Sequence, residues 1–157
     1  MAFGENRAVG GTGWNVWRGV IGGFYLLSAV FNAAYTLPLA DEADTFDGYA
    51  DGAWFPFLTD FMQDVFMPNA AAFMIVVIVL EVIVGSLIMG RGGWVDLGAA
   101  ASLVWVVAIL PFLAWPYLLV NIALVALQGV VLLRRYPDSI WHLITQRFST
   151  RGTAHPG

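Results

Sequence analysis

Residues 70–89 read AAAFMIVVIVLEVIVGSLIM, and Glu81 is the one charged side chain in this run. An α-helix rises about 1.5 Å per residue, so a run of this length crosses the ~30 Å hydrocarbon core of a bilayer. A strand of a membrane barrel would alternate apolar and polar residues over about ten positions. The stretch therefore predicts a transmembrane helix.

Three further apolar runs, at about 17–37, 95–112 and 115–133, predict three more spans. Apolar residues make up 59% of the 157 positions and charged residues 11%, whereas a soluble domain has about 25% charged residues. We therefore expect one all-α membrane domain, a bundle of four transmembrane helices with an outer loop at 38–69 and a tail at 134–157. The first span is longer than the apolar core of a signal peptide and lacks a convincing cleavage site, so we expect it to be retained.

The basic residues predict the orientation. All seven are arginines, and they fall in the N-terminal part, the connection between the second and third spans, or the tail: Arg7, Arg18, Arg91, Arg134, Arg135, Arg147 and Arg151. The outer loop instead holds Asp41, Glu42, Asp44, Asp47, Asp51, Asp60 and Asp64. Because basic residues stay on the cytoplasmic side, we expect an integral protein of the cytoplasmic (plasma) membrane with both termini in the cytoplasm.

The outer loop has two parts. Residues 39–52 are acidic and are expected to be irregular, whereas apolar residues recur at helical spacing in Trp54, Phe57, Leu58, Phe61, Met62, Val65 and Phe66. This spacing predicts an amphipathic helix that either lies in the outer interface or forms a lid over a cavity between the spans. A second amphipathic stretch, 139–148, is expected on the inner surface.

Polar residues within the spans are the candidate site. A charged residue at the centre of a membrane helix costs about 2.5–3.5 kcal/mol, so Glu81 is expected to face the bundle interior, to be protonated or to have a partner. At 1.5 Å per residue, Glu81, Ser28, Ser102 and Gln128 lie roughly 15–20 Å from the outer ends of their spans, and Asn32 and Asn121 about 9 Å. We predict that these six side chains form a ligand-binding layer. The same residues would also suit a network that only fixes helix packing, or a proton-linked site.

Several chemistries are not expected. The chain has no cysteine, which excludes disulfides and thiolate metal sites. Both histidines, His142 and His155, lie in the tail, so a bis-histidine haem within the bundle is excluded and no metal site is expected. The sequence shows neither a nucleotide-binding loop nor a placed catalytic triad, and we expect neither catalysis by the chain alone nor nucleic-acid binding.

The second predicted span carries a recognisable pattern, Glu81-x-x-x-Gly85-x-x-x-Met89-Gly90-Arg91. With Arg18-x-x-x-Gly22 and Ser28-Ala29-x-x-Asn32 in the first span, and the long outer loop between them, it resembles the DoxX-like family of small four-helix membrane proteins. The resemblance covers roughly residues 17–133. A difference is Asn32, where family members often have a basic residue or histidine, so the resemblance does not extend to an ion pair with Glu81.

The resemblance implies an accessory or anchor subunit of a membrane redox assembly, with protein partners and a quinone near Glu81 and Gln128. The residues alone leave two alternatives open. One is a module that binds or transports a hydrophobic small molecule or lipid, with Glu81 as its polar anchor. The other is a purely structural membrane protein. Small residues four apart, such as Gly98 and Ser102, fit close helix packing or an oligomer equally well.

Overall fold

The computed structural model describes residues 8–42 and 44–145, and the described chain is helical. Its elements are α1 (Thr12–Phe31), the π-helical turn η1 (Asn32–Thr36), α2 (Asp47–Asp51), α3 (Pro56–Phe61), the π-helical turn η2 (Met62–Phe66), the 3₁₀ turn η3 (Met67–Asn69), α4 (Ala70–Ile88), α5 (Gly93–Ile109), the 3₁₀ turn η4 (Leu110–Phe112) and α6 (Tyr117–Val131). A short helix at 140–145 follows.

The membrane character of the chain follows from these helices. Three continuous helical segments are long and apolar enough to cross a bilayer, namely Thr12–Thr36, Pro56–Ile88 and Gly93–Phe112. The fourth apolar helix, α6, has 15 residues and is shorter. The prediction of an all-α chain is therefore confirmed. Three of its helices are long and apolar enough to cross a bilayer, and the fourth is shorter.

Helices α1 and α4 cross at a pair of glycines. A Cβ on Gly22 would lie 2.5 Å from the Met89 Cγ and 3.1 Å from the Gly85 carbonyl oxygen. A Cβ on Gly85 would lie 2.9 Å from the Gly22 carbonyl oxygen. The missing side chains therefore let the two backbones touch, as small residues do in membrane helix pairs. Gly98 does the same for α5, where a Cβ would lie 2.8 Å from the backbone nitrogen of Ile88.

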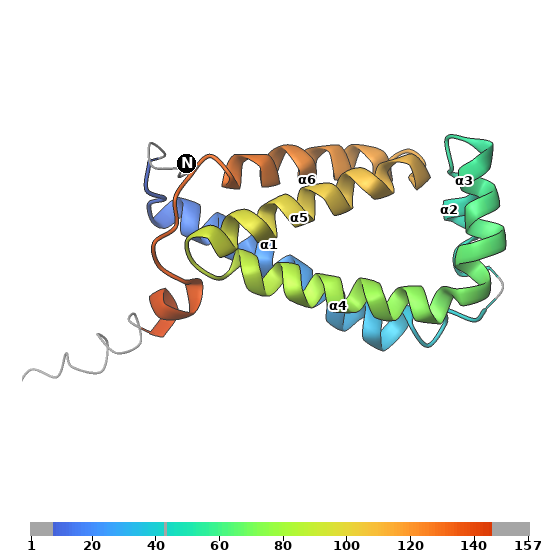
Figure 1. Cartoon of the computed structure of the whole chain (residues 1–157), viewed down its shortest axis with the longest axis horizontal. Coiled ribbons are helices and arrows are strands. Elements are labelled where there is room, and N and C mark those ends of the chain that lie inside the picture. Colours follow the sequence, from blue (N-terminus) through green and yellow to red (C-terminus); the bar gives the residue numbers. More distant parts are fainter. Residues whose placement is uncertain (1–7, 43, 146–157) are drawn as a thin grey trace, which may run out of the picture.

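The four long helices form two arms (Figure 1). One arm contains α1 and α4, the other α5 and α6. They approach each other at one end, where the turn between α4 and α5 is closed by Gly92 at φ 57°, a left-handed conformation that glycine adopts without strain. Toward the other end the arms diverge, and residues 47–69, which we call the strap, lie across that end.

The strap joins the two arms. Its Trp54 backbone N–H donates to the Pro111 carbonyl at 2.9 Å, and the Phe61 and Phe112 rings lie 6.4 Å apart. On the α4 side, Met62 is buried in an apolar cluster with Met74. Helical turns occur where the amphipathic helix was predicted, and they change from α to π to 3₁₀ before α4. The region expected to be irregular contains one short helix, α2.

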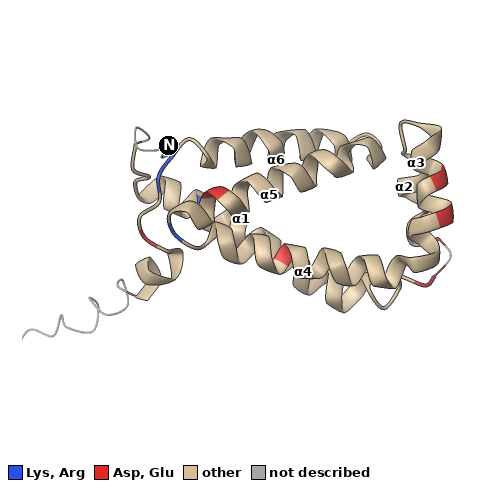
Figure 2. Cartoon of the chain, viewed as in Figure 1, with Lys and Arg blue, Asp and Glu red and all other residues tan. Residues whose placement is uncertain are grey.

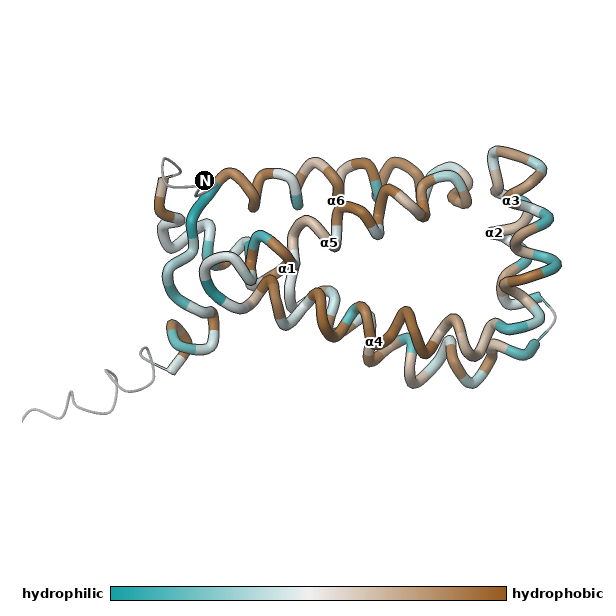
Figure 3. The backbone as a smooth tube through the Cα atoms, in the orientation of Figure 1, coloured by the Kyte–Doolittle hydropathy of each residue, from teal (hydrophilic) through white to brown (hydrophobic). Residues whose placement is uncertain are grey.

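Charges separate to the two ends of the molecule (Figure 2). The described arginines Arg18, Arg91, Arg134 and Arg135 lie opposite the strap, at what we call the arginine end. Most described acidic residues lie in or beside the strap. Hydrophobic residues dominate the helices between these ends (Figure 3). This distribution is that of a chain with an apolar middle layer and two polar faces.

Candidate functional site

Glu81 lies near the middle of α4 and is 7% exposed. Ser28 Oγ of α1 donates to its Oε1 at 2.7 Å, and Asn32 Nδ2 donates to its Oε2 at 2.9 Å. Both carboxylate oxygens therefore accept a hydrogen bond, and both donors are neutral. The predicted inward orientation of Glu81 is confirmed.

The network continues along α1 toward the strap. Thr36 Oγ1 donates to Asn32 Oδ1 at 2.9 Å, so Asn32 links Thr36 to the carboxylate. Asn32 and Thr36 are the first and last residues of the π-helical turn η1, in which the Leu37 N–H bonds the Asn32 carbonyl. Single π turns within α-helices frequently mark functional sites, because they re-aim side chains that a regular helix would place elsewhere.

A second polar group joins α1 to the other arm. Gln128 of α6 is 2% exposed, and its Nε2 donates to the Tyr25 hydroxyl at 3.0 Å. Ser102 of α5 is fully buried, donates to the Ala99 carbonyl at 2.8 Å, and also interacts with the Tyr25 hydroxyl. Tyr25 lies within electrostatic range of Glu81. These contacts make two hydrogen-bonded groups, one around Glu81 and one around Tyr25. Together they include a side chain from each long helix, and we call them the polar layer.

One oxygen atom of this layer lacks a described hydrogen-bond donor. Gln128 Oε1 is buried and has no hydrogen-bond partner among the described residues. A buried acceptor of this kind costs about 1–3 kcal/mol when nothing donates to it. Most buried polar atoms in folded proteins have a partner, so this oxygen is a place where a donor would be stabilised.

The structure brings together five of the six predicted side chains. Asn121 does not join them, because its Nδ2 donates to the Tyr117 carbonyl of its own helix at 3.0 Å. It lies one turn into α6, and the start of α6 is at the end of the molecule where the two arms have diverged (Figure 1). Sequence reasoning missed Tyr25 and Thr36. Their spacing from Ser28 and Asn32, one helical turn each, is the signal that could have found them.

Arg18 is the other residue whose role the sequence did not reveal. It is fully buried at the arginine end. Its Nη1 donates to the Gly90 carbonyl and its Nη2 to Asn15 Oδ1 and to the Asp138 carbonyl, all at 2.9 Å. Its guanidinium lies 4.5 Å from the Tyr136 ring centroid. Arg18 therefore ties α1 to the α4–α5 turn and to the segment after α6.

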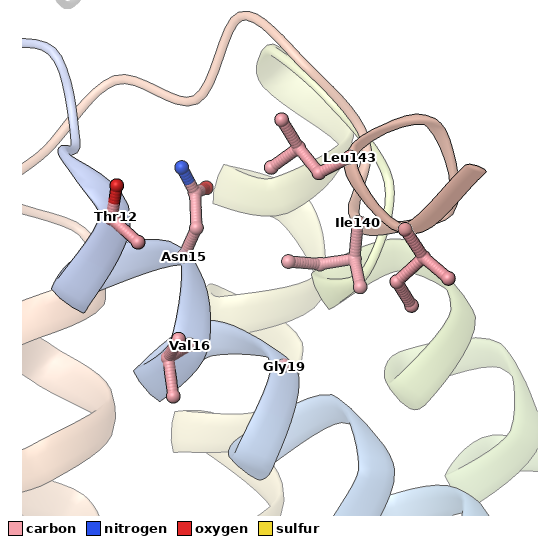
Figure 4. Close-up of a pocket in the computed structure, with 7 residues that line it drawn as sticks. Thr12, Asn15, Val16, Gly19, Ile140 and Leu143 are labelled. Atoms are coloured by element: carbon pink, nitrogen blue, oxygen red, sulfur yellow. The ribbon is translucent and has the colours of Figure 1, made fainter. Parts of the chain in front are cut away.

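A groove of about 310 Å³ lies beside this junction (Figure 4). Its lining consists of Thr12, Asn15, Val16 and Gly19 of α1 together with Ile140, Leu143 and Ile144. The helix at 140–145 accounts for part of the predicted second amphipathic stretch, and the rest of it, including Arg147, lies outside the described residues. The groove contains no ionisable side chain and is separate from the polar layer.

Within residues 8–42 and 44–145, no three histidine, aspartate or glutamate side chains gather as a metal site would require. The polar layer offers one carboxylate, hydroxyls and amides. Such a set binds by hydrogen bonding.

The fold and the layer define a class: a helical membrane protein with a hydrogen-bonded carboxyl group in its apolar middle. Comparison with known proteins gives no relative, since no protein-family model, curated protein or solved structure matches the chain. The resemblance to the DoxX-like family therefore stays a prediction, and the functional argument depends on the site itself.

Proposed function

We propose that this protein is a four-span membrane protein that binds a hydrophobic small molecule or lipid bearing a hydrogen-bond donor, with Glu81 as its polar anchor. Four spans are supported by the apolar sequence at 115–133, whose length is near the ~20 residues needed and of which α6 covers Tyr117–Val131. The cytoplasmic placement of both termini is supported by the arginines at one end (Figure 2).

The observation that carries the ligand proposal is the surplus of acceptors in the buried layer. A carboxylate offers about four lone-pair positions, and the Glu81 carboxylate receives two described side-chain donors, from Ser28 and Asn32. Gln128 Oε1 adds a buried acceptor without a described partner. A network that served packing alone would match donors to acceptors, because each unmatched buried acceptor lowers stability.

The chemistry of the ligand follows from these acceptors. A hydroxyl or amine that reaches Glu81 or Gln128 would donate to an acceptor oxygen with room for a further donor. The surrounding side chains are apolar, so the rest of the molecule should be apolar too. A charge-assisted hydrogen bond to Glu81 contributes about 1.5–3 kcal/mol, which corresponds to about a 10- to 150-fold gain in affinity.

A matched pair of probes tests this proposal. A long-chain primary alcohol and its methyl ether have similar apolar bodies, but only the alcohol donates a hydrogen bond. At about ten times its Kd a ligand stabilises the folded state by about 1.4 kcal/mol, so the alcohol should raise the Tm of the detergent-solubilised protein measurably and the ether much less.

Glu81→Gln is the variant to compare, because it keeps the size of the side chain but removes the charge. We expect it to lose most of the alcohol response. Asp60→Asn, on the exposed face of the strap, should respond like the wild type. Equal shifts from alcohol and ether, or a full response in Glu81→Gln, would contradict the proposal.

The role in a membrane redox assembly remains a second proposal. A quinol carries hydroxyl donors on an apolar body, so it belongs to the ligand class that the surplus acceptors favour. Purification in mild detergent followed by protein mass spectrometry tests this role. Repeated recovery of the chain without a redox partner would count against it.

A further inference from the structure

Glu81 has different surroundings toward the two ends of the bundle. Toward the arginine end lies a cluster of buried, largely aliphatic side chains from all four long helices. It contains Ile21, Val84, Ile88, Val95, Ala99 and Val131, together with Tyr25 and Tyr136. Beyond it, Arg18 is held by its three hydrogen bonds. Water and ions would have to cross this apolar cluster to reach the carboxylate from the arginine end.

Toward the strap, the neighbours of Glu81 are polar. Asn32 and Thr36 follow one another along the helix, and the hydrogen bonds Thr36–Asn32 and Asn32–Glu81 are both 2.9 Å long. Both side chains are only half-buried, whereas Glu81 is buried. The next residue after η1 is Leu37, where the chain leaves the first span. The polar groups thus lead from the middle of the apolar layer to its strap end.

We propose that Glu81 exchanges protons with the aqueous phase at the strap end and not with the phase at the arginine end. An amide carries protons poorly, so Asn32 and Thr36 act as a polar lining along which water approaches. The carboxylate then takes a proton from a hydronium ion and leaves a water molecule. This inference rests on the proposed function in that both assign a role to the Glu81 carboxyl.

The charged groups around Glu81 are few. From α1 the Tyr25 hydroxyl faces it, and Arg18 lies on the far side of the apolar cluster. Helix α5 carries Asp96 in its first turn at the arginine end, and α6 carries Tyr117 at its strap end. The two donors to the carboxylate are neutral. Proton uptake would therefore remove a charge that no described cation offsets in the middle of the membrane.

The test uses sealed vesicles that contain the full chain, with the two aqueous phases buffered separately. Dicyclohexylcarbodiimide dissolves in the lipid and reacts with protonated carboxyl groups, so it reaches Glu81 from either side and reports only on protonation. Mass spectrometry of the peptide that contains Glu81 measures the labelling rate. When the strap-side pH is raised, we expect the labelling rate to fall several-fold, and we expect it to be unchanged by the pH at the arginine end.

Variants test whether Asn32 and Thr36 form the path by which protons reach Glu81, with a control for effects on folding. The pair Asn32→Val and Thr36→Val should lose the dependence on the strap-side pH, whereas Val30→Leu, on the exposed face of α1, should keep it. Three outcomes would overturn the inference: labelling that depends on the pH at the arginine end, labelling that depends equally on both phases, or no labelling at any pH. The alcohol probe reports on ligand binding independently, so failure of access and failure of binding give different patterns.

Discussion

A charged Glu81 in the middle of the membrane lowers stability, and its hydrogen bonds compensate for this cost. A charged residue at this depth costs about 2.5–3.5 kcal/mol, and a hydrogen bond to a charged group contributes about 1.5–3 kcal/mol. The bonds from Ser28 and Asn32 are therefore of the same size as the cost. Apolar side chains at position 81 and at both donor positions would need no such compensation, which favours a functional role for the carboxyl group.

Replacing Glu81 with leucine should still destabilise the protein, because the donors on Ser28 and Asn32 would lose their acceptor. We expect a loss of about 1–3 kcal/mol. Glu81→Gln keeps one acceptor oxygen and should lose less. Unfolding in detergent by heat or denaturant measures both, with Val82→Leu on the exposed face as the control. A Glu81→Leu protein as stable as the wild type would show that the network contributes nothing to folding.

Arg18 shows what a sequence does not reveal. Arg18 lies at the same end of the molecule as the other described arginines (Figure 2). Two of its three hydrogen-bond acceptors are backbone carbonyls, at Gly90 and Asp138, and a backbone carbonyl has no sequence signature. The Glu81 layer was predictable in part because its members are polar side chains at similar depths in apolar helices.

Arg18→Met should release the segment after α6. The variant keeps most of the side-chain volume but loses three hydrogen bonds, so we expect at least about 2 kcal/mol less stability. Trypsin should then cut after Arg134 or Arg135 several times faster, as followed by mass spectrometry. Arg91→Gln removes an exposed arginine and should leave this rate unchanged. A wild-type rate in Arg18→Met would mean that other contacts hold the segment.

At the scale of elements, hydropathy predicts the long helices well and their details poorly. The second span was expected at 70–89 and α4 runs from Ala70 to Ile88. The first helix begins at Thr12, five residues earlier than expected, because its first turns pack at the arginine end as well as in the apolar layer. The π turn η1 could not be predicted, since the backbone bond from the Leu37 N–H to the Asn32 carbonyl has no signature in hydropathy.

The glycines of α1 and α4 differ in how much space surrounds the position of a Cβ: Gly85 has close neighbours there and Gly23 has none. Gly85→Ala would place a methyl group against the Gly22 backbone, and we expect it to cost about 1–3 kcal/mol. Gly23 has no atom within 4 Å of the position of a Cβ, so Gly23→Ala should be neutral or stabilise the helix by up to about 1 kcal/mol. Thermal unfolding of the two variants compares them directly. Equal effects would contradict the close crossing.

At the scale of the whole molecule, the two arms and the strap could not be derived from span lengths. Sequence reasoning predicted a bundle, whereas the structure shows arms that diverge toward the strap (Figure 1). That divergence explains why Asn121, at a depth similar to that of Asn32, stays outside the polar layer.

Orientation in the membrane is a separate prediction at this scale. The natural chain lacks cysteine, so a single cysteine can be introduced at Thr45, beside the strap, or at Ser139, at the arginine end. In intact cells, an impermeant maleimide should label Thr45→Cys and should label Ser139→Cys only after the membrane is opened. The reverse pattern would place the termini outside.

The central claim is that Glu81 anchors a hydrophobic ligand, and native mass spectrometry of the protein as purified in mild detergent tests it most directly. We expect the wild type and Asp60→Asn to carry a bound small molecule that survives gentle activation, and Glu81→Gln to have lost most of it. If the wild type and Glu81→Gln show the same bound mass, or both show the mass of the bare chain, Glu81 is not a ligand anchor.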